Sequence, residues 1–271
     1  MTTIRRLFLL FGVVGALAVL GAACSSDSGG DESDTGAATT EASEGGTESG
    51  EEELSYAEGG ADWVEFEPAC GGSSQSPIDL AEAVDGDVAD PVVDWSSDGL
   101  EIENKGHTTE VYVAPGESTT TLQGEEWELV RFHWHEPSEH VNGDDAYDME
   151  LHFVHQRTVD GATENAVLGV LIETGDANPT YDPIWAAQPD EEGTREPLDA
   201  DLDITTLLPD DLATVTYEGS LTTPPCSEGI SWNVLTTPVT ISAEQIEAFA
   251  HPGTAREAQD LNGREVTADN T

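Results

Sequence analysis

The chain is poor in basic side chains. Its 271 residues include 8 lysines and arginines against 56 aspartates and glutamates. The segment before Leu54 holds 10 of these acids and 2 of the bases, which leaves 46 acids and 6 bases, a net charge of −40, for the rest of the chain. Because such a surface repels phosphate backbones and anionic lipids, the composition excludes nucleic acid and an anionic membrane surface as partners. We interpret the acidity as adaptation to a saline (halophilic) habitat, with general solubility of a secreted protein as the alternative.

Apolar runs of membrane-spanning length are missing from the N-terminal segment. The run Leu7–Leu20 is shorter than the roughly 20 residues that a spanning helix needs. It follows two arginines and precedes the small residues GAA and then Cys24, which is the pattern of a signal peptide. The cysteine after the small residues resembles a bacterial lipobox. We therefore predict a lipoprotein signal peptide over residues 1–24, with the lipid on Cys24; a plain secretion signal with an incidental cysteine is the alternative.

Residues 25–53 lack aromatic and large aliphatic side chains altogether. A segment of this kind cannot bury enough apolar surface to offset the entropy lost on ordering. We predict that residues 25–53 form a disordered, acidic tether rich in glycine, serine and threonine. No repeat and no second linker follow, so residues 54–271 are predicted to form one folded domain.

Cysteine is scarce, with Cys70 and Cys226 as the two that lie beyond the predicted lipid anchor. An exported domain meets an oxidising environment, in which two cysteines can form a disulfide. Two free buried thiols are the alternative to a disulfide. One cysteine in each half of the domain does not indicate a metal site.

Short runs of alternating or β-forming residues recur through the domain, separated by turn sequences. One helix is indicated at Ser242–Ala250, where Ser242 has the position of an N-cap and Gln245 follows three residues later. This pattern predicts a mainly β, single domain with a few short helices. The runs predicted as strands are Leu100–Ile102, Thr109–Val113, Trp127–His135, Met149–His155, Ala166–Ile172, Ala213–Tyr217 and Ser231–Leu235.

Three histidines stand out within two of these predicted strands. His133 and His135 are two residues apart, so on a strand their side chains point to the same face. If the strand that carries His152 lies alongside, its imidazole can join the other two. Three histidines with one open position are the ligand set of catalytic zinc sites. The spacing alone leaves two interpretations open, a zinc site and core histidines that are satisfied by hydrogen bonds.

Six longer motifs resemble the α-class carbonic anhydrases, in the same order and over about residues 56–264. The resemblance implies a domain built on a large twisted, mostly antiparallel central sheet with a few short peripheral helices. It implies reversible hydration of carbon dioxide to bicarbonate and a proton, by attack of a zinc-bound hydroxide. The motifs are QSPID (75–79), NKGH (104–107), VRFHWHEPSEH (130–140), MELHFVH (149–155), GSLTTPPCSEGISW (219–232) and LNGR (261–264).

The resemblance also assigns roles to individual residues. His133, His135 and His152 match the zinc ligands. Thr222 and Glu139 match the pair that orients the hydroxide, in which the carboxylate accepts the hydroxyl proton of the threonine. His107 matches the histidine that shuttles the proton to solvent. The residues that match the binding site for carbon dioxide and bicarbonate are Val154, Val167, Leu221, Thr222, Thr223, Ile230 and Trp232.

The same resemblance places supporting residues around the ligands. Glu150 is expected to accept a hydrogen bond from His152, and a backbone carbonyl one from His135. For His133 the sequence departs from the family, because Arg131 occupies the position of a glutamine and a guanidinium has no acceptor.

Other positions complete the assignment. Tyr56 and Asn104 match residues that order water, and Cys70 and Cys226 match a disulfide. His140 and His155 are expected in the core, and His251 is expected to be exposed.

Two other classes of function are compatible with parts of the sequence. A binding module that has lost catalysis is one, although all three histidines, Glu139 and Thr222 are present. A zinc hydrolase acting on esters is the other, and it would use the same nucleophile. We expect a protein outside the cytoplasm, on the outer face of the cell membrane and in contact with that membrane only through the lipid on Cys24. The sequence leaves the oligomeric state open.

Overall fold

The computed structural model describes residues 54–143 and 145–269. The predicted signal peptide, the predicted lipidation site Cys24 and the predicted tether lie outside these described residues. No helix among the described residues combines the length and apolar character needed to cross a membrane. In chain order, the strands are β1 (Val84–Gly86), β2 (Val92–Asp94), β3 (Glu101–Asn104), β4 (Thr109–Tyr112), β5 (Thr119–Leu122), β6 (Glu125–His135), β7 (Val141–Asn142), β8 (Asp145–Ala146), β9 (Met149–Val159), β10 (Ala162–Thr174), β11 (Arg195–Pro197), β12 (Thr214–Ser220), β13 (Glu228–Ile241) and β14 (Thr267–Asp269).

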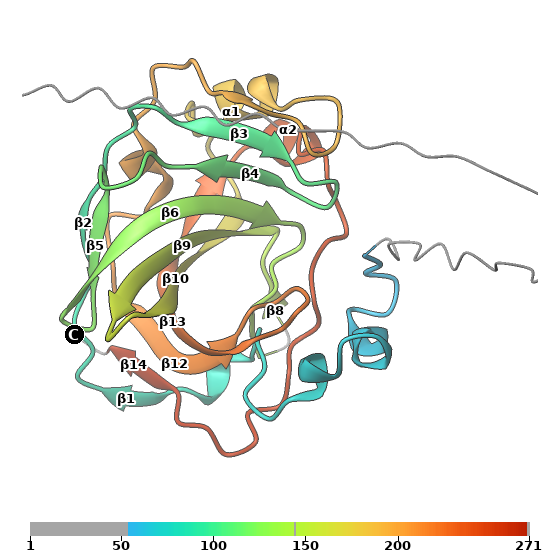
Figure 1. Ribbon diagram of the computed structural model, residues 1–271, viewed down its shortest axis with the longest axis vertical. Helices are drawn as coiled ribbons and strands as arrows, with labels where there is room; N and C mark the ends of the chain where they lie inside the picture. The colour runs from blue at the N-terminus through green and yellow to red at the C-terminus, as the bar shows by residue number, and fades with distance from the viewer. Residues whose placement is uncertain (1–53, 144, 270–271) are drawn as a thin grey trace, which may run out of the picture. The chain divides into compact units, whose positions relative to one another are not determined.

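Helices are few and short. Figure 1 shows α1 and α2 together at one end of the sheet. Ser242 and Gln245 form a capping box at the start of α2, as the sequence predicts, but the helix ends three residues earlier than predicted. The helices are α1 (Tyr181–Ala187), α2 (Ala243–Glu247) and the 3₁₀ turns η1 (Ala61–Glu65), η2 (Pro68–Gly71), η3 (Leu80–Glu82) and η4 (Ile204–Leu207).

One twelve-stranded sheet dominates the domain (Figure 1). Its main order is β1-β14-β12-β13-β10-β9-β6-β4-β3-β11, and β5 joins β6 with β2 at its side. Neighbouring strands are antiparallel except for the pairs β1–β14 and β10–β13. The prediction of a large, mostly antiparallel central sheet is therefore confirmed. The seven predicted strands correspond to β3, β4, β6, β9, β10, β12 and β13, most of which are longer in the structure.

Alternation along the central strands separates two environments. On β6, Phe132 and Trp134 point into the larger hydrophobic core, together with Phe153 of β9. Residues between them point to the opposite face, where Val154 and Trp232 belong to a second cluster. Because side chains alternate on a strand, burying the aromatic residues on one face presents the histidines of β6 on the other.

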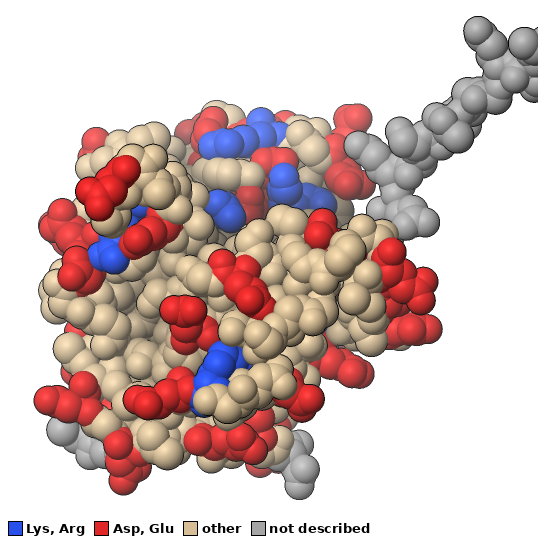
Figure 2. Space-filling view, turned by 60° about the horizontal axis from the view of Figure 1, so that its bottom comes forward, with Lys and Arg blue, Asp and Glu red and all other residues tan. Residues whose placement is uncertain are grey.

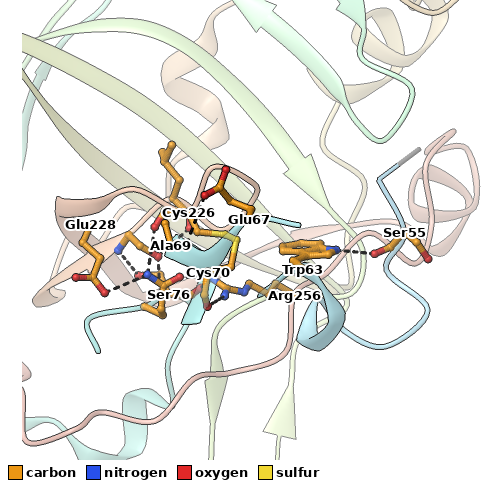
Figure 3. Close-up of a disulfide and its surroundings, with 12 residues drawn as sticks. Ser55, Trp63, Glu67, Ala69, Cys70, Ser76, Cys226, Glu228 and Arg256 are labelled. Carbon is orange, nitrogen blue, oxygen red and sulfur yellow. Dashed lines mark hydrogen bonds between the residues drawn. A yellow bond between two sulfur atoms is a disulfide. The ribbon is translucent and has the colours of Figure 1, made fainter. Parts of the chain in front are cut away.

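The N-terminal described segment is fastened to the sheet by a disulfide between Cys70 and Cys226 (Figure 3). The carbonyl oxygen of Cys70 accepts a hydrogen bond from the Arg256 guanidinium, at 2.9 Å. Nearby, the buried indole of Trp63 donates to the carbonyl oxygen of Ser55 at 2.8 Å. The disulfide therefore links η2 to the loop that follows β12, as the family resemblance implies.

Acidic side chains are spread over the face shown in Figure 2, with few basic ones between them. Four of the six basic residues beyond Leu54 form ion pairs with glutamates, at 2.5–3.1 Å. The other two, Arg256 and Arg264, donate mainly to backbone carbonyl oxygens. Most of the acidic side chains therefore have no cation of this chain beside them.

Candidate metal centre

The three histidines predicted as ligands meet on one face of β6 and β9. His133 lies directly opposite His152 in the antiparallel pairing, and His135 follows two residues along the same face. The ring centroids are 4.8–5.3 Å apart, and one ring nitrogen of each residue lies within 4.8 Å of the other two. This is a spacing at which one ion can contact all three imidazoles.

Hydrogen bonds decide which nitrogen of two of these rings is available. His135 donates from Nδ1 to the Thr254 carbonyl oxygen at 2.7 Å, and His152 donates from Nε2 to Glu150 Oε1 at 2.9 Å. These are the contacts that the sequence leads us to expect. They leave Nε2 of His135 and Nδ1 of His152 as unprotonated ligand atoms.

Glu150 is buried, and four donors converge on its carboxylate. Besides His152, it accepts from the backbone N–H groups of Glu139 and His140, at 2.9 and 2.8 Å, and from Nδ1 of His140 at 2.7 Å. Burial by itself raises the pKa of a carboxyl group, but His140 and His152 hold the pKa of Glu150 well below its usual range. Gly169 makes room for this carboxylate, because a Cβ there would lie 3.2 Å from Glu150 Oε1.

Glu139 lies beneath the histidines, fully enclosed. Its Oε1 accepts the backbone N–H of Arg256 at 3.0 Å, and its Oε2 is 3.5 Å from His135 Nε2 and 3.9 Å from His152 Nδ1. Burial raises the pKa of Glu139 to about 7, against the lowering effects of His152, of the Arg256 N–H and of a hydrogen bond from Thr222. The sequence prediction that Glu139 and Thr222 lie together agrees with this arrangement.

A pocket of about 280 Å³ opens above the histidines. Apolar side chains form one wall, and Thr222 and Thr223 lie beside them. Ile230 does not line the pocket but is buried in the same hydrophobic cluster as Trp232. A second pocket, of about 530 Å³, lies over β6, β9, β12 and β13. Its lining side chains are mainly polar or acidic and include no histidine, so it lacks the ligands of a zinc site. The apolar wall consists of Val154, Val167, Leu221 and Trp232.

Charged side chains surround the mouth of the pocket. Lys105, His107, Glu110 and Arg131 all line it. Arg131 Nε is 3.1 Å from Glu110 Oε2, and Lys105 Nζ is 3.1 Å from a glutamate of β3. Burial, followed by the nearby ring of His135, lowers the pKa of His107. The mouth therefore holds a histidine that is neutral near pH 7.

His133 has a different environment from the other two ligands. Burial lowers its pKa well below the usual range, and the neighbouring histidines and Arg131 add to this effect. Its Nδ1 is buried and has no hydrogen-bond partner among the described residues. The Glu110 carboxylate is 3.9 Å away from that nitrogen.

Two residues are expected to order water, and one of them, Tyr56, lies near enough to Glu139 that the carboxylate adds to the effect of burial in raising the pKa of its hydroxyl. Asn104 donates to the Pro189 carbonyl oxygen at 3.0 Å and accepts the Gly106 N–H at 2.9 Å, so its amide is occupied by backbone groups. Tyr56 packs edge-on against Trp63, with its hydroxyl buried. Neither residue lines the pocket.

The remaining histidines lie outside the cluster of three. His140 and His155 are fully buried, as expected. The expectation that His251 is exposed is wrong. Its ring is partly buried, and its Nε2 lies 2.9 Å from the Gln188 amide, because the chain folds back after α2.

The side chains present fit a zinc ion. Among the described residues, the buried His135 Nε2, which faces the cluster, has no hydrogen-bond partner. Neutral imidazoles are preferred zinc ligands, and three of them leave one coordination position open. A zinc ion would use this unpaired nitrogen as a ligand.

Sequence reasoning expected a backbone carbonyl for His135 without identifying the residue that supplies it, and it missed two further groups that support the site. The Thr254 carbonyl, the Arg256 N–H and Glu110 all approach from segments far from the histidines in the sequence. A backbone group carries no side-chain signature, so no motif could have identified the first two. Glu110 was detectable only with the register of β4 against β6, which places it opposite His133.

Three histidines that the central strands of a β domain gather beneath an apolar pocket are typical of metal-dependent enzymes. Comparisons with known proteins define the class further. The family model for eukaryotic-type carbonic anhydrases matches residues 58–270.

Individual relatives agree with the family model. A carbonic anhydrase of Nostoc sp. is 40% identical over 203 residues, covering 72% of this chain and 75% of the relative. One from Neisseria gonorrhoeae is 38% identical over 205 residues, covering 74% and 80%. The structure also matches the α-carbonic anhydrase of Thermovibrio ammonificans in complex with sulfanilamide, with a TM-score of 0.69 and 38% identity over 76% of this chain and 93% of that one. The chain belongs to the carbonic anhydrase family and is an enzyme of that family, which implies hydration of carbon dioxide.

Proposed function

We propose that this protein hydrates carbon dioxide reversibly, with zinc held by His133, His135 and His152. The observation that carries the proposal is the convergence of three neutral imidazoles, within 4.8 Å, at the base of a pocket with an apolar wall. Zinc bound there lowers the pKa of its water to about 7, a value known for carbonic anhydrase itself, and so supplies a hydroxide nucleophile at neutral pH.

Glu139 and Thr222 orient the nucleophile. When Glu139 is ionised, its carboxylate can only accept, so the Thr222 hydroxyl directs its proton at Glu139 and its lone pair toward the pocket. The Arg256 N–H holds the far oxygen of Glu139 in place at 3.0 Å. The Thr222 oxygen can therefore accept a hydrogen bond from the nucleophile in one direction only, and this hydrogen bond orients the nucleophile for its attack on the substrate.

The apolar wall receives the substrate. Carbon dioxide carries no charge, so a surface made of Val154, Val167, Leu221 and Trp232 holds it without requiring hydrogen bonds. Thr223 lies at the edge of the same pocket and offers a hydroxyl to the bicarbonate product. Ile230 supports this wall indirectly, because it belongs to the same buried hydrophobic cluster as Trp232.

His107 accepts the proton that each hydration releases. It lies at the mouth of the pocket, and its lowered pKa keeps it neutral and able to accept at pH 7. With the amide of Asn104 occupied by backbone groups, we propose that the water between the ligands and His107 is ordered by other polar groups that line the pocket, among them Thr223.

Stopped-flow measurement of carbon dioxide hydration tests the proposal. We expect activity that disappears with a zinc chelator, returns with added zinc and is inhibited by sulfanilamide. Glu139→Gln should lose most of the activity while still binding zinc, and Glu103→Gln, on β3, serves as the matched carboxylate control. Absence of zinc-dependent hydration in the folded parent chain would overturn the proposal.

We also propose that the enzyme acts outside the cytoplasm, anchored through a lipid on Cys24. The Cys70–Cys226 disulfide supports an oxidising compartment, and the leader sequence supports lipidation. Replacing Cys24 by serine should release the protein from membranes into the soluble fraction. Equal membrane retention of the parent and the C24S variant would contradict the anchor.

A further inference from the structure

The outward nitrogens of the three histidines are supported unequally. His135 and His152 each donate to a fixed acceptor within 2.9 Å, whereas Nδ1 of His133 has none among the described residues. This nitrogen is buried, although the ring as a whole is partly exposed at the pocket. A buried N–H that lacks an acceptor is costly, so a nearby acceptor is required when the opposite nitrogen binds a metal.

Glu110 is placed to be that acceptor. It lies directly opposite His133 in the β4–β6 pairing, and Tyr112 lies opposite Arg131. Side chains opposite each other in an antiparallel pair share a face, so Glu110 points to the same side as the histidine. Its Oε2 is 3.9 Å from His133 Nδ1, about 1 Å beyond hydrogen-bond distance.

Two neighbours hold the Glu110 carboxylate at this position. Arg131 Nε is 3.1 Å from the same Oε2, and the Tyr112 hydroxyl also hydrogen-bonds to Glu110. Arg131 has no acceptor of its own and therefore cannot take the proton of His133. The positive charge of Arg131 can, however, balance the negative charge of the Glu110 carboxylate, which can take that proton.

We propose that Glu110, held by Arg131 and Tyr112, accepts the Nδ1–H of His133 in the metal-loaded enzyme. Glu110 and Arg131 together then replace the single glutamine that the family resemblance leads us to expect at position 131. The step requires only a small rotation of the carboxylate toward the ring. A carboxylate acceptor makes a charge-assisted hydrogen bond and increases the basicity of the ligand. Glu110 is thus a positioning residue for His133, and this inference rests on the proposed zinc site.

Zinc affinity and zinc release measure this role directly. Competition with a chelator should show a loss of about 10–100-fold in affinity for Glu110→Ala, with faster release of zinc. Glu110→Gln keeps a carbonyl acceptor and should recover most of the loss. Glu103→Ala is the matched control, because Glu103 pairs with Lys105 and also bonds to Tyr112 but is not opposite His133. That control should hold zinc as the parent does.

The same substitution made in an Arg131→Gln variant distinguishes a role of Glu110 in positioning His133 from a general effect on the structure. In Arg131→Gln, the glutamine carbonyl can accept from His133, so adding Glu110→Ala should cost little further zinc affinity. In the zinc-loaded parent, the Nδ1–H proton of His133 should be observable by NMR and protected from exchange, and Glu110→Ala should remove that protection. The melting temperature of each zinc-free variant reports folding, and Glu110→Leu, which also lacks an acceptor, replaces Glu110→Ala if the latter does not fold.

The outcomes distinguish this inference from the proposed function. Equal zinc affinity and equal proton protection in the parent and the folded Glu110 variants overturn the role of Glu110 and leave the zinc enzyme intact. An equal loss of affinity from Glu110→Ala in both backgrounds also overturns it, because the glutamine would then provide no substitute. A folded parent that binds no zinc overturns the inference together with the proposed function.

Discussion

The deep side of the histidine cluster and its mouth are built on different principles. On the deep side, Glu139 and Glu150 are fully buried, and both oxygens of Glu150 and Oε1 of Glu139 accept from backbone N–H groups or imidazoles at 2.7–3.0 Å. At the mouth, Glu110 and Arg131 pair at 3.1 Å with side chains 12% and 30% exposed. The hydrogen bonds of the deep side restrict its carboxylates to one conformation, whereas the ion pair at the mouth is accessible to water. The deep residues match the expected pattern, and the one clear departure, Arg131, lies at the mouth.

The largest expected difference between the two regions is in stability. Glu150→Gln should lower the free energy of unfolding by about 3–5 kcal/mol, because one amide oxygen cannot serve four buried donors and the hydrogen bonds to a charged carboxylate are lost. Glu110→Gln should change it by less than about 1 kcal/mol, as is usual for a partly exposed pair. Denaturant unfolding of both zinc-free variants checks this. Equal losses would show that the two regions do not differ.

His107 should separate catalysis from stability at the mouth. Its replacement by alanine should reduce the hydration rate by about 100-fold in weakly buffered solution, because proton transfer by a positioned side chain contributes on that scale. Small imidazole buffers should restore part of the rate, while zinc affinity and the melting temperature remain those of the parent. A variant with the parent rate would assign the proton transfer to another group.

His155 tests whether burial alone, without a ligand role, makes a histidine sensitive to acid. Burial lowers the pKa of His155 to about 3, and its Nε2 lies 2.8 Å from the Thr120 hydroxyl. The unfolded chain binds a proton near pH 6.5 and the folded chain does not, so this contribution to stability is complete above pH 6.5 and declines as the pH falls toward 3. The loss attributable to His155 at pH 4.5 should be about 2–3 kcal/mol.

His155→Asn provides the comparison for this pH effect. Asparagine does not titrate, so the difference in unfolding free energy between the parent and the variant should change by that amount between pH 7 and pH 4.5. Parallel curves for the two proteins over this range would contradict the prediction.

The smallest expected effect concerns salt. A net charge of −40 on the chain beyond residue 53 should make unfolding easier at low ionic strength, and screening should raise stability by about 1 kcal/mol or more between 0.05 and 1 M sodium chloride. The deep hydrogen bonds are shielded from solvent, so the effect of Glu150→Gln should be the same at both concentrations. Full stability without added salt would contradict adaptation to a saline habitat.

Prediction from the sequence was most successful where metal-binding side chains recur at the two-residue period of a β-strand. The H-x-H spacing places His133 and His135 on one face, whatever the rest of the fold, because side chains alternate on a strand. The long motifs then indicated His152, Glu139 and Thr222, which the structure brings to the same place. Reasoning was weaker for His251, because its ring contacts Gln188, which lies 63 residues away in the sequence. Short strands such as β1 and β14 were missed because three residues carry too little periodicity to recognise.

The amino-acid sequence by itself determined the ligand types, their common face on β6, the excess of negative charge and the family to which the motifs belong. Only the tertiary structure decided which groups lie beside the outward nitrogens of His133 and His135. The pairing of β4 with β6 sets Glu110 opposite His133, and the chain after α2 brings the Thr254 carbonyl and the Arg256 N–H beneath the site. The physical reason is that register between strands and the path of a returning segment depend on the packing of the whole core, whereas alternation along one strand is a local property of the backbone.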